Sequence, residues 1–366
     1  MGQTLSGAVS KPYIIIHHKV NNSANRPALV EPPAFVSLGM MTLLRNGDQP
    51  KIKGHVLEGP GLYATFGARL FSPDTAKNIG CVIIPGNGFP YSLYRTLASW
   101  NINLVVHRLK KPAPVNYLRG PYSQKPVSTA IEPIIAPIYD TVLLSANSFH
   151  FCGLPSEVAK QVTNLFELRK HRNIADRPVV VWETASQSFD ENNLSNMGDA
   201  LPLVEIFSPS YEDLPSADQM RTRFIRQTIE QEAQSFCQRG IGPDRNGVTV
   251  IRCGPHGCFY MRNEQEKGWV NPIINNRAVD PTGSSSAFLG AFTDAYLKNA
   301  SLEECCLRGQ VAATLALEQF GLPQMTKPLR SGLETWNNLT PFFQLEHHTQ
   351  YYMFMRSHPE YNQIQP

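Results

Sequence analysis

Short apolar runs alternate along this chain with longer amphipathic stretches, and the alternation predicts its architecture. Five apolar runs are expected to form buried strands: Cys81–Ile84, Asn103–Val106, Thr141–Leu144, Val179–Trp182 and Val204–Phe207. The helical stretches expected among them are Tyr91–Trp100, Glu157–Lys170 and Ala217–Arg239. Strands that alternate with helices in this way are typical of a parallel sheet covered by helices on both faces. The sequence therefore predicts an α/β protein with a doubly wound, mostly parallel sheet.

Further elements are expected toward both ends of this region. The apolar run Phe35–Leu44 fits a buried first strand. Trp269–Val279 is strand-like and leads into a helix of small residues, Ser285–Lys298. A second helix rich in Ala and Leu is expected over Leu302–Gln319. Ser301 is its expected N-cap, because a serine hydroxyl can accept a hydrogen bond from a free helix amide.

Composition and charge narrow the class of protein. With 366 residues and 42% hydrophobic content, the chain can bury a large core in one large domain or two. The net charge is only +3 and Lys and Arg are spread along the chain, so no nucleic-acid partner is expected. Seven cysteines, without a secretory signal pattern or zinc spacing, fit a reducing compartment, and we expect a cytoplasmic protein with no metal site. No apolar run reaches the roughly 18 residues of a membrane-spanning helix.

The two ends of the chain differ from its middle. Residues 1–33 are expected to form an N-terminal extension, and Met1–Ser6 meets the pattern for myristoylation of Gly2. A single myristoyl chain would give only weak membrane association. Residues 331–366 form a tail rich in aromatic side chains, which argues against disorder. This tail is expected to pack on the body of the protein or on a second subunit, so a homodimer is one alternative.

A glycine turn, Asp280–Ser286, precedes the helix of small residues and reads D-P-T-G-S-S-S. Backbone amides at a helix N-terminus attract anions, and glycine lets the chain approach one closely. With Ala287 and Phe288, the turn resembles the D-T-x-G-A-G-D-A-F motif of the ribokinase or PfkB family of carbohydrate kinases. In that motif the last Asp is the base that deprotonates a sugar hydroxyl, and Ser286 stands in its place. An ordinary capped helix is the alternative interpretation.

The replacement of the base has a consequence for activity. Serine cannot act as a base near neutral pH, and loss of a positioned base typically costs about 100- to 10,000-fold in rate. An efficient sugar kinase is therefore not expected.

Other segments resemble landmarks of the same family, in the same order. Glu58–Leu70 resembles a Gly-Gly-x-x-x-Asn-x-Ala segment at the start of a helix, and Tyr63 stands near the usual Asn. Leu44 lies in the stretch where the family places an Asp that holds sugar hydroxyls. Val248–Tyr260 resembles the strand, Gly-x-x-Gly turn and strand near the nucleotide. The resemblance implies a substrate site that is bulkier and more apolar than one for a polyol.

The segments that resemble the family's cofactor-binding segments also differ from the family motif. Ser210 and Asp213 stand where the family has an Asn and a Glu that help to organise magnesium and phosphate. ATP and magnesium binding, if retained, is therefore expected to be weak. The candidate cofactor-binding residues are Gly254, Gly257, Asp280, Gly283 and Ser286.

The resemblance covers residues 34–330. Gly39 and Met40, together with the strand Val180–Glu183, are similar to a fungal PfkB-like branch. The resemblance implies a ribokinase-like α/β domain with a small β lid, formed by excursions near residues 44–57 and 108–127.

Polar residues at strand ends mark the expected crevice, since ligands of such sheets bind outside the carboxyl ends of the strands. The candidate catalytic residues are His107, His150 and Glu183, although structural histidines and a Glu paired with an Arg would explain them as well. The candidate substrate-binding residues are Leu44, Gly61, Tyr63, Asn87 and Phe89.

Three functions stay open. The first is a repurposed enzyme of the isomerase, cyclase or lyase type, acting on a small molecule more apolar than a sugar. The second is a noncatalytic nucleotide-binding or scaffold protein, and the third is a slow carbohydrate kinase with a displaced base.

Overall fold

The structure is a computed structural model that describes most of the chain. The described residues are 13–15, 31–38, 40–45, 55–85, 89–107, 115–117, 138–139, 141–217, 225–326 and 333–358. The predicted myristoylation site at Gly2 and the candidate Asn87 lie outside them, as does much of both expected lid excursions.

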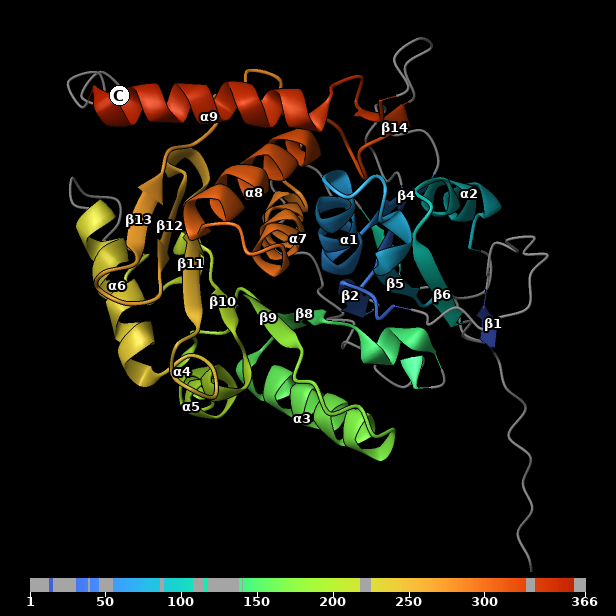
Figure 1. Ribbon diagram of the computed structural model, residues 1–366, viewed down its shortest axis with the longest axis horizontal. Helices are drawn as coiled ribbons and strands as arrows, with labels where there is room; N and C mark the ends of the chain where they lie inside the picture. The colour runs from blue at the N-terminus through green and yellow to red at the C-terminus, as the bar shows by residue number, and fades with distance from the viewer. Residues whose placement is uncertain are drawn as a thin grey trace, which may run out of the picture.

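One large sheet forms the centre of the described part of the chain (Figure 1). Its ten strands lie in the spatial order β1 (Tyr13–Ile15), β6 (Asn103–His107), β5 (Ile79–Ile83), β2 (Phe35–Leu38), β8 (Ser148–Gly153), β9 (Val179–Thr184), β10 (Ile206–Ser208), β11 (Val248–Arg252), β12 (Cys258–Met261) and β13 (Lys267–Val270). The strands from β6 to β11 are parallel, whereas β1, β12 and β13 join antiparallel. The predicted fold class, a mostly parallel α/β sheet, is confirmed.

Helices cover both faces of the sheet, so its central strands are buried along nearly their whole length. The helices are α1 (Pro60–Leu70), α2 (Tyr91–Ser99), α3 (Pro155–His171), α4 (Glu191–Leu194), α5 (Met197–Ala200), α6 (Ile225–Arg239), α7 (Ser284–Leu297), α8 (Leu302–Leu317) and α9 (Pro341–Ser357). Buried side chains of α3 and α6 share one core with the sheet, and those of α1, α7 and α8 form the core on the other face. Figure 1 shows these two layers on opposite sides of the strands.

Helices α1 and α7 touch backbone to backbone, and two glycines allow it. A Cβ on Gly67 of α1 would lie 2.0 Å from the carbonyl oxygen of Ala287. A Cβ on Gly290 of α7 would lie 1.9 Å from the carbonyl oxygen of Ala64. Because a larger residue cannot fit at either place, the two glycines fix how closely α7 crosses α1.

Three strand predictions were wrong. The run Phe35–Leu44 is not one strand: β2 ends at Leu38, Met40 has a φ of 38° that breaks the extended backbone, and Thr42–Arg45 pairs in a separate small sheet. Thr141–Leu144 does not form a strand, since a short 3-10 helix occupies Val142–Ser145. The strand is β8, which begins at Ser148 and contains His150 in its interior instead of after its end. The run Trp269–Val279 is also not a strand throughout, because β13 ends at Val270 and Pro272 follows, a residue without the amide that a sheet needs.

A small separate sheet lies beside the large one. It orders β4 (His55–Glu58), β3 (Thr42–Arg45) and β7 (Val115–Tyr117). Its strands overlap the two segments in which a lid is expected, although β3 begins at Thr42, before the first segment. A two-stranded pair, β14 (Met325–Thr326) and β15 (Thr335–Trp336), precedes the last helix.

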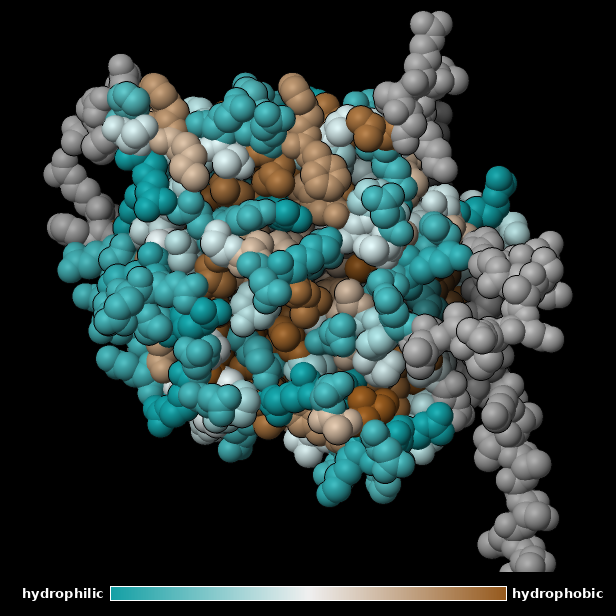
Figure 2. All heavy atoms as spheres, viewed as in Figure 1, coloured by the Kyte–Doolittle hydropathy of each residue, from teal (hydrophilic) through white to brown (hydrophobic). Residues whose placement is uncertain are grey.

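The aromatic C-terminal segment forms α9, which packs on α8 (Figure 1). The buried Tyr352 donates its hydroxyl to the backbone oxygen of Trp269 at 3.2 Å and to Glu303 at 3.1 Å. Several apolar side chains of α9 stay exposed, among them Phe342, Phe343 and Phe354. Figure 2 shows apolar side chains among polar ones on the viewed face of the molecule. In the part of the chain that the structure describes, no helix combines the length and apolarity needed to cross a bilayer.

Candidate functional site

The start of α7 lies at the carboxyl edge of the large sheet and brings several polar side chains together. Gly283 is the residue before the helix and has a φ of 78°, a left-handed conformation that favours glycine. Asp280 accepts hydrogen bonds at Oδ1 from the amide of Thr282 at 3.1 Å and from its hydroxyl at 2.8 Å. The amides of Val279 and Asp280 both donate to the carbonyl of Leu317, which ties the turn to the end of α8.

A buried ionic network lies beneath this helix start, centred on Glu183 of β9. His150 Nε2 lies 3.0 Å from Glu183 Oε2, and since a carboxylate only accepts, the imidazole donates. Arg252 of β11 donates to Glu183 Oε1 at 3.2 Å, and the Ser286 hydroxyl donates to the same oxygen at 3.0 Å. We call these four residues the inner network. All four are buried, at 7% exposure or less.

Ser208 also binds the Arg252 side chain. Arg252 donates through Nε to the Ser208 hydroxyl at 3.0 Å and through Nη2 to the Ser208 backbone oxygen at 3.0 Å. Burial alone would raise the pKa of Glu183, but the hydrogen bond from His150 and the charge of Arg252 outweigh burial and lower this pKa. The carboxylate is therefore ionised, and both of its oxygens are occupied.

A second polar group lies on the other side of the helix start, and we call it the crevice cluster. It consists of Glu58 at the end of β4, Tyr63 in the first turn of α1, and Asp280. The Tyr63 ring packs directly on Gly283, where an added Cβ would lie 2.1 Å from Cδ2 of the ring. Burial and the nearby charge of Asp280 raise the pKa of Glu58 to about 7.

Two polar atoms of the crevice cluster lack hydrogen bonds. Oε1 of Glu58 and the hydroxyl of Tyr63 are buried without a hydrogen-bond partner among the described residues. Burial raises the pKa of Tyr63 above its ordinary range, and the charges of Glu58 and Asp280 add to this effect.

The other predicted site residues are scattered. His107 ends β6, which is separated from β8 by β5 and β2, so the structure does not bring His107 to His150 and Glu183. Leu44 lies in β3, paired with Val56. The Gly61 amide donates to the carbonyl of Met40, and Phe89 stacks edge-on against Tyr94 with ring centroids 4.7 Å apart.

The Gly-x-x-Gly segment forms a tight turn between β11 and β12. Gly254 has a φ of 51° and Gly257 a φ of 88°. The Tyr211 ring lies edge-on to His256 within this turn, with ring centroids 5.9 Å apart. Burial raises the pKa of Asp213, although the charge of Arg252 opposes the shift.

Side chains at the start of α7 are engaged in contacts within the protein. At the start of α7, the ring of Tyr63 lies against Gly283, and the Ser286 hydroxyl points to Glu183 instead of toward a phosphate.

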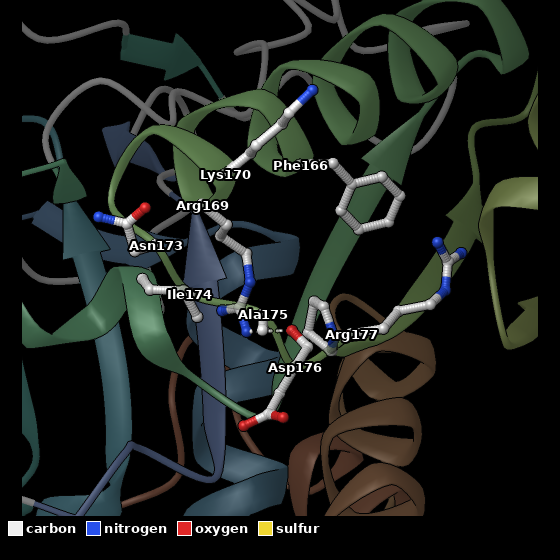
Figure 3. Close-up of a pocket in the computed structure, with 9 residues that line it drawn as sticks. Phe166, Arg169, Lys170, Asn173, Ile174, Ala175, Asp176 and Arg177 are labelled. Carbon is white, nitrogen blue, oxygen red and sulfur yellow. Dashed lines mark hydrogen bonds between the residues drawn. The ribbon is translucent and has the colours of Figure 1, made fainter.

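A cavity of about 580 Å³ lies at the opposite end of the strands, between the end of α3 and the start of β9. Figure 3 shows Arg169 pointing inward there, where it donates to the backbone oxygen of Asp176 at 2.7 Å. Its other guanidinium nitrogen donates to the carbonyls of Leu144 and Ala146. Arg169 thus stabilises the loops around it, and this cavity does not belong to the site at α7.

Sequence reasoning missed two members of the site. Arg252 follows the apolar run Val248–Ile251, which is the same signal that singled out Glu183 after its own apolar run. Glu58 lies at the start of the segment that resembles the family's Gly-Gly turn, but its burial near the charge of Asp280 cannot be read from the sequence. Ser208, which holds Arg252, carries no signal that separates it from other serines.

Comparison with known proteins identifies the family. The model of the pfkB family of carbohydrate kinases matches residues 140–327, more than half of the chain. The chain belongs to the pfkB family. The match spans β8, β9, β11 and α7, the elements that carry the inner network.

Relatives of this pfkB-family chain include fungal proteins. An uncharacterised protein of Schizosaccharomyces pombe is 27% identical over 347 residues, covering 88% of this chain and 94% of that protein. Protein MAK32 of Saccharomyces cerevisiae is 22% identical over 306 residues, covering 77% and 82%. A putative ribokinase II from Escherichia coli, solved with ATP and Mg²⁺, superposes with a TM-score of 0.60 at 15% identity, covering 87% of this chain and 99% of that one. This last likeness shows the fold alone.

Proposed function

We propose that this pfkB-family protein does not phosphorylate sugars efficiently and instead uses the old substrate crevice for other small-molecule chemistry. The reaction would be of the isomerase, cyclase or lyase type, on a molecule more apolar than a sugar. The observation that carries the proposal is the hydrogen bond from Ser286 to Glu183. At the helix start where this family is expected to hold a free base, the carboxylate that Ser286 contacts is already bound by three partners.

A general base needs a free lone pair and a pKa near the working pH. Glu183 is a poor candidate, because three of its roughly four lone-pair sites accept hydrogen bonds and its pKa is lowered. Its salt bridge with Arg252 is buried, so releasing the carboxylate would leave an uncompensated charge. The inner network therefore supports the helix start and is not a proton acceptor for a sugar hydroxyl.

The test is an assay of ADP release over pentoses, hexoses and nucleosides. The expected rate is at background for the wild type. Ser286→Asp is expected to restore little, because the new carboxylate would face Glu183 and the sugar site is also altered. Turnover of about 10 per second, that of an ordinary enzyme, would refute the proposal.

One observation favours a second candidate, a slow kinase with a displaced base. Glu58 is a carboxyl with a pKa near 7, and Tyr63 connects it to the helix start at Gly283. If Glu58 were that base, Glu58→Gln would abolish a slow ADP release that the wild type shows. Calorimetry tests the alternative of a noncatalytic nucleotide-binding protein. An ATP affinity tighter than roughly 1 μM would indicate a retained nucleotide site.

A further inference from the structure

Two buried polar atoms of the crevice cluster lack a hydrogen-bond partner among the described residues. They are Oε1 of Glu58 and the hydroxyl of Tyr63, in residues that are 8% and 1% exposed. Buried polar groups in folded proteins are almost always paired, with protein, water or a ligand. Two neighbouring polar atoms without hydrogen bonds therefore point to a missing hydrogen-bond partner.

The two side chains are neighbours because of the way α1 begins. Gly59 is the N-cap, so Glu58 directly precedes the cap and Tyr63 is the fourth residue of the helix. Side chains at these two positions meet at the start of a helix. The charge of Glu58 also raises the pKa of Tyr63, after the larger effect of burial. No hydrogen bond joins the two side chains, so neither one satisfies the other.

Both groups can donate. The Tyr63 hydroxyl keeps its proton at neutral pH, and below about pH 7 the Glu58 carboxyl is mostly protonated. Two neighbouring donors match a single oxygen that has two lone pairs, as a carbonyl oxygen has. The charge of the neighbouring Asp280 opposes an anion at these donors, so an uncharged ligand fits better than a carboxylate.

We propose that Glu58 and Tyr63 form a two-donor site for the carbonyl oxygen of an uncharged small molecule bound in the crevice. The inference rests on the proposed function and names its substrate class. A carboxylic acid and a phenol donating to one oxygen in a buried site would also stabilise negative charge that develops on that oxygen. Such a pair suits isomerase or lyase chemistry at a carbon next to the carbonyl.

Cyclohexanone is a suitable probe, followed by nuclear magnetic resonance titration of the full chain at pH 6. The wild type is expected to bind it, and Tyr63→Phe is expected to weaken binding about tenfold, the effect of one hydrogen bond. Methylenecyclohexane, which has the same shape without the oxygen, should bind both proteins equally. Cyclohexanecarboxylate should bind neither.

Raising the pH from 6 to 8 should weaken cyclohexanone binding to the wild type, since Glu58 loses its proton. The titratable groups that face Glu58 in the described structure are Asp280 before α7 and Tyr63 on α1. Glu58→Gln, whose amide still donates, should bind cyclohexanone with no pH dependence over this range. An unchanged pH dependence in Glu58→Gln would contradict the assignment of the second donor.

Thermal unfolding distinguishes a ligand site from a structural role. Tyr63→Phe keeps the ring on Gly283 and removes an unpaired hydroxyl, so its Tm should stay level or rise. The matched control is Tyr352→Phe, which loses two hydrogen bonds and should lower Tm while leaving probe binding unchanged. Equal binding of cyclohexanone by wild type and Tyr63→Phe, no binding by the wild type, or a lower Tm for Tyr63→Phe would each overturn the proposal. The ADP-release assay is independent of these results, so a kinase would be recognised separately.

Discussion

The inner network and the crevice cluster lie on two sides of the start of α7. Each contains a buried glutamate, and the pKa values of the two glutamates are shifted in opposite directions. In the inner network, Glu183 accepts hydrogen bonds on both oxygens, and its pKa is lowered. In the crevice cluster, Glu58 has an unpaired oxygen, and its pKa is raised to about 7. Two glutamates at similar burial thus differ because one has cationic and hydrogen-bonding partners and the other faces Asp280.

The difference distinguishes residues that stabilise the fold from residues that are available to a ligand. A buried charge with all its partners stabilises the fold only while every partner is present. A buried polar group without a partner costs free energy of folding, and such costs are tolerated mainly where a ligand supplies the partner. Glu183 has its partners, whereas Nδ1 of His150 is also buried without a hydrogen-bond partner among the described residues. In our proposal the crevice cluster carries the better candidates for chemistry, and the catalytic roles predicted for His150 and Glu183 stay predictions.

The largest effect is expected from Arg252→Met. The substitution leaves the buried Glu183 carboxylate without its cation, and the free energy of unfolding should fall by about 3 to 5 kcal/mol. Chemical denaturation measures the change. The control is Arg262→Met at a pair with partly exposed side chains, Arg262–Glu266, which should cost about 1 kcal/mol or less. Similar losses in the two variants would show that the inner network is no more than a surface ion pair.

The next effect is a pH dependence that comes from Glu58. Its pKa is about 7 in the folded protein and near 4.5 when unfolded, so its contribution to stability is fully present below about pH 4.5. It is lost as the pH rises to about 7, and the loss amounts to about 3 kcal/mol. Glu58→Gln should abolish this change, as measured by the difference in unfolding free energy from pH 4 to 8. Glu183 contributes with the opposite sign, since its lowered pKa favours the fold at higher pH. A difference between wild type and Glu58→Gln that stays flat with pH would mean that Glu58 is solvated.

A smaller effect is expected at the joint between the two regions. Gly283→Ala should cost about 2 kcal/mol, because the φ of 78° strains any other residue and the new Cβ would overlap the Tyr63 ring. In a Tyr63→Ala background the additional cost should shrink to about 1 kcal/mol, the strain alone. Gly198→Ala is the control, since nothing lies within 4 Å of its Cβ position and no loss is expected. Full additivity of Gly283→Ala and Tyr63→Ala would contradict the close packing.

The smallest effect is expected from Ser286→Ala. It removes one of several hydrogen bonds to Glu183, so the free energy of unfolding should fall by about 1 kcal/mol. Ser284→Ala, which removes an exposed bond to the carbonyl of Pro281, should cost less. Denaturation curves for the two variants measure the contrast. A stabilising Ser286→Ala would indicate that the hydroxyl does not serve the inner network.

The sequence predicted most of the fold and part of the site. Apolar periodicity located β5, β6, β9 and the two long helices α7 and α8, because these elements are buried on the faces that the pattern marks. It failed at β8, where Ser148, His150 and Cys152 dilute the apolar run although the strand is buried at the centre of the sheet. The apolar residues of Thr141–Leu144 belong instead to a 3-10 turn packed on the core.

What the sequence determined by itself was the family, the order of the elements and the loss of Asp at Ser286, since each is a local pattern of residue types. Only the tertiary structure decided which polar residues meet. Glu183 and Arg252 are 69 residues apart and lie on β9 and β11, and crossover connections bring them to the same end of the sheet. Glu58 and Asp280 meet because α1 and α7 approach at two glycines. Whether a buried glutamate is ionised depends on neighbours that are distant in the chain, so no local pattern could distinguish Glu183 from Glu58.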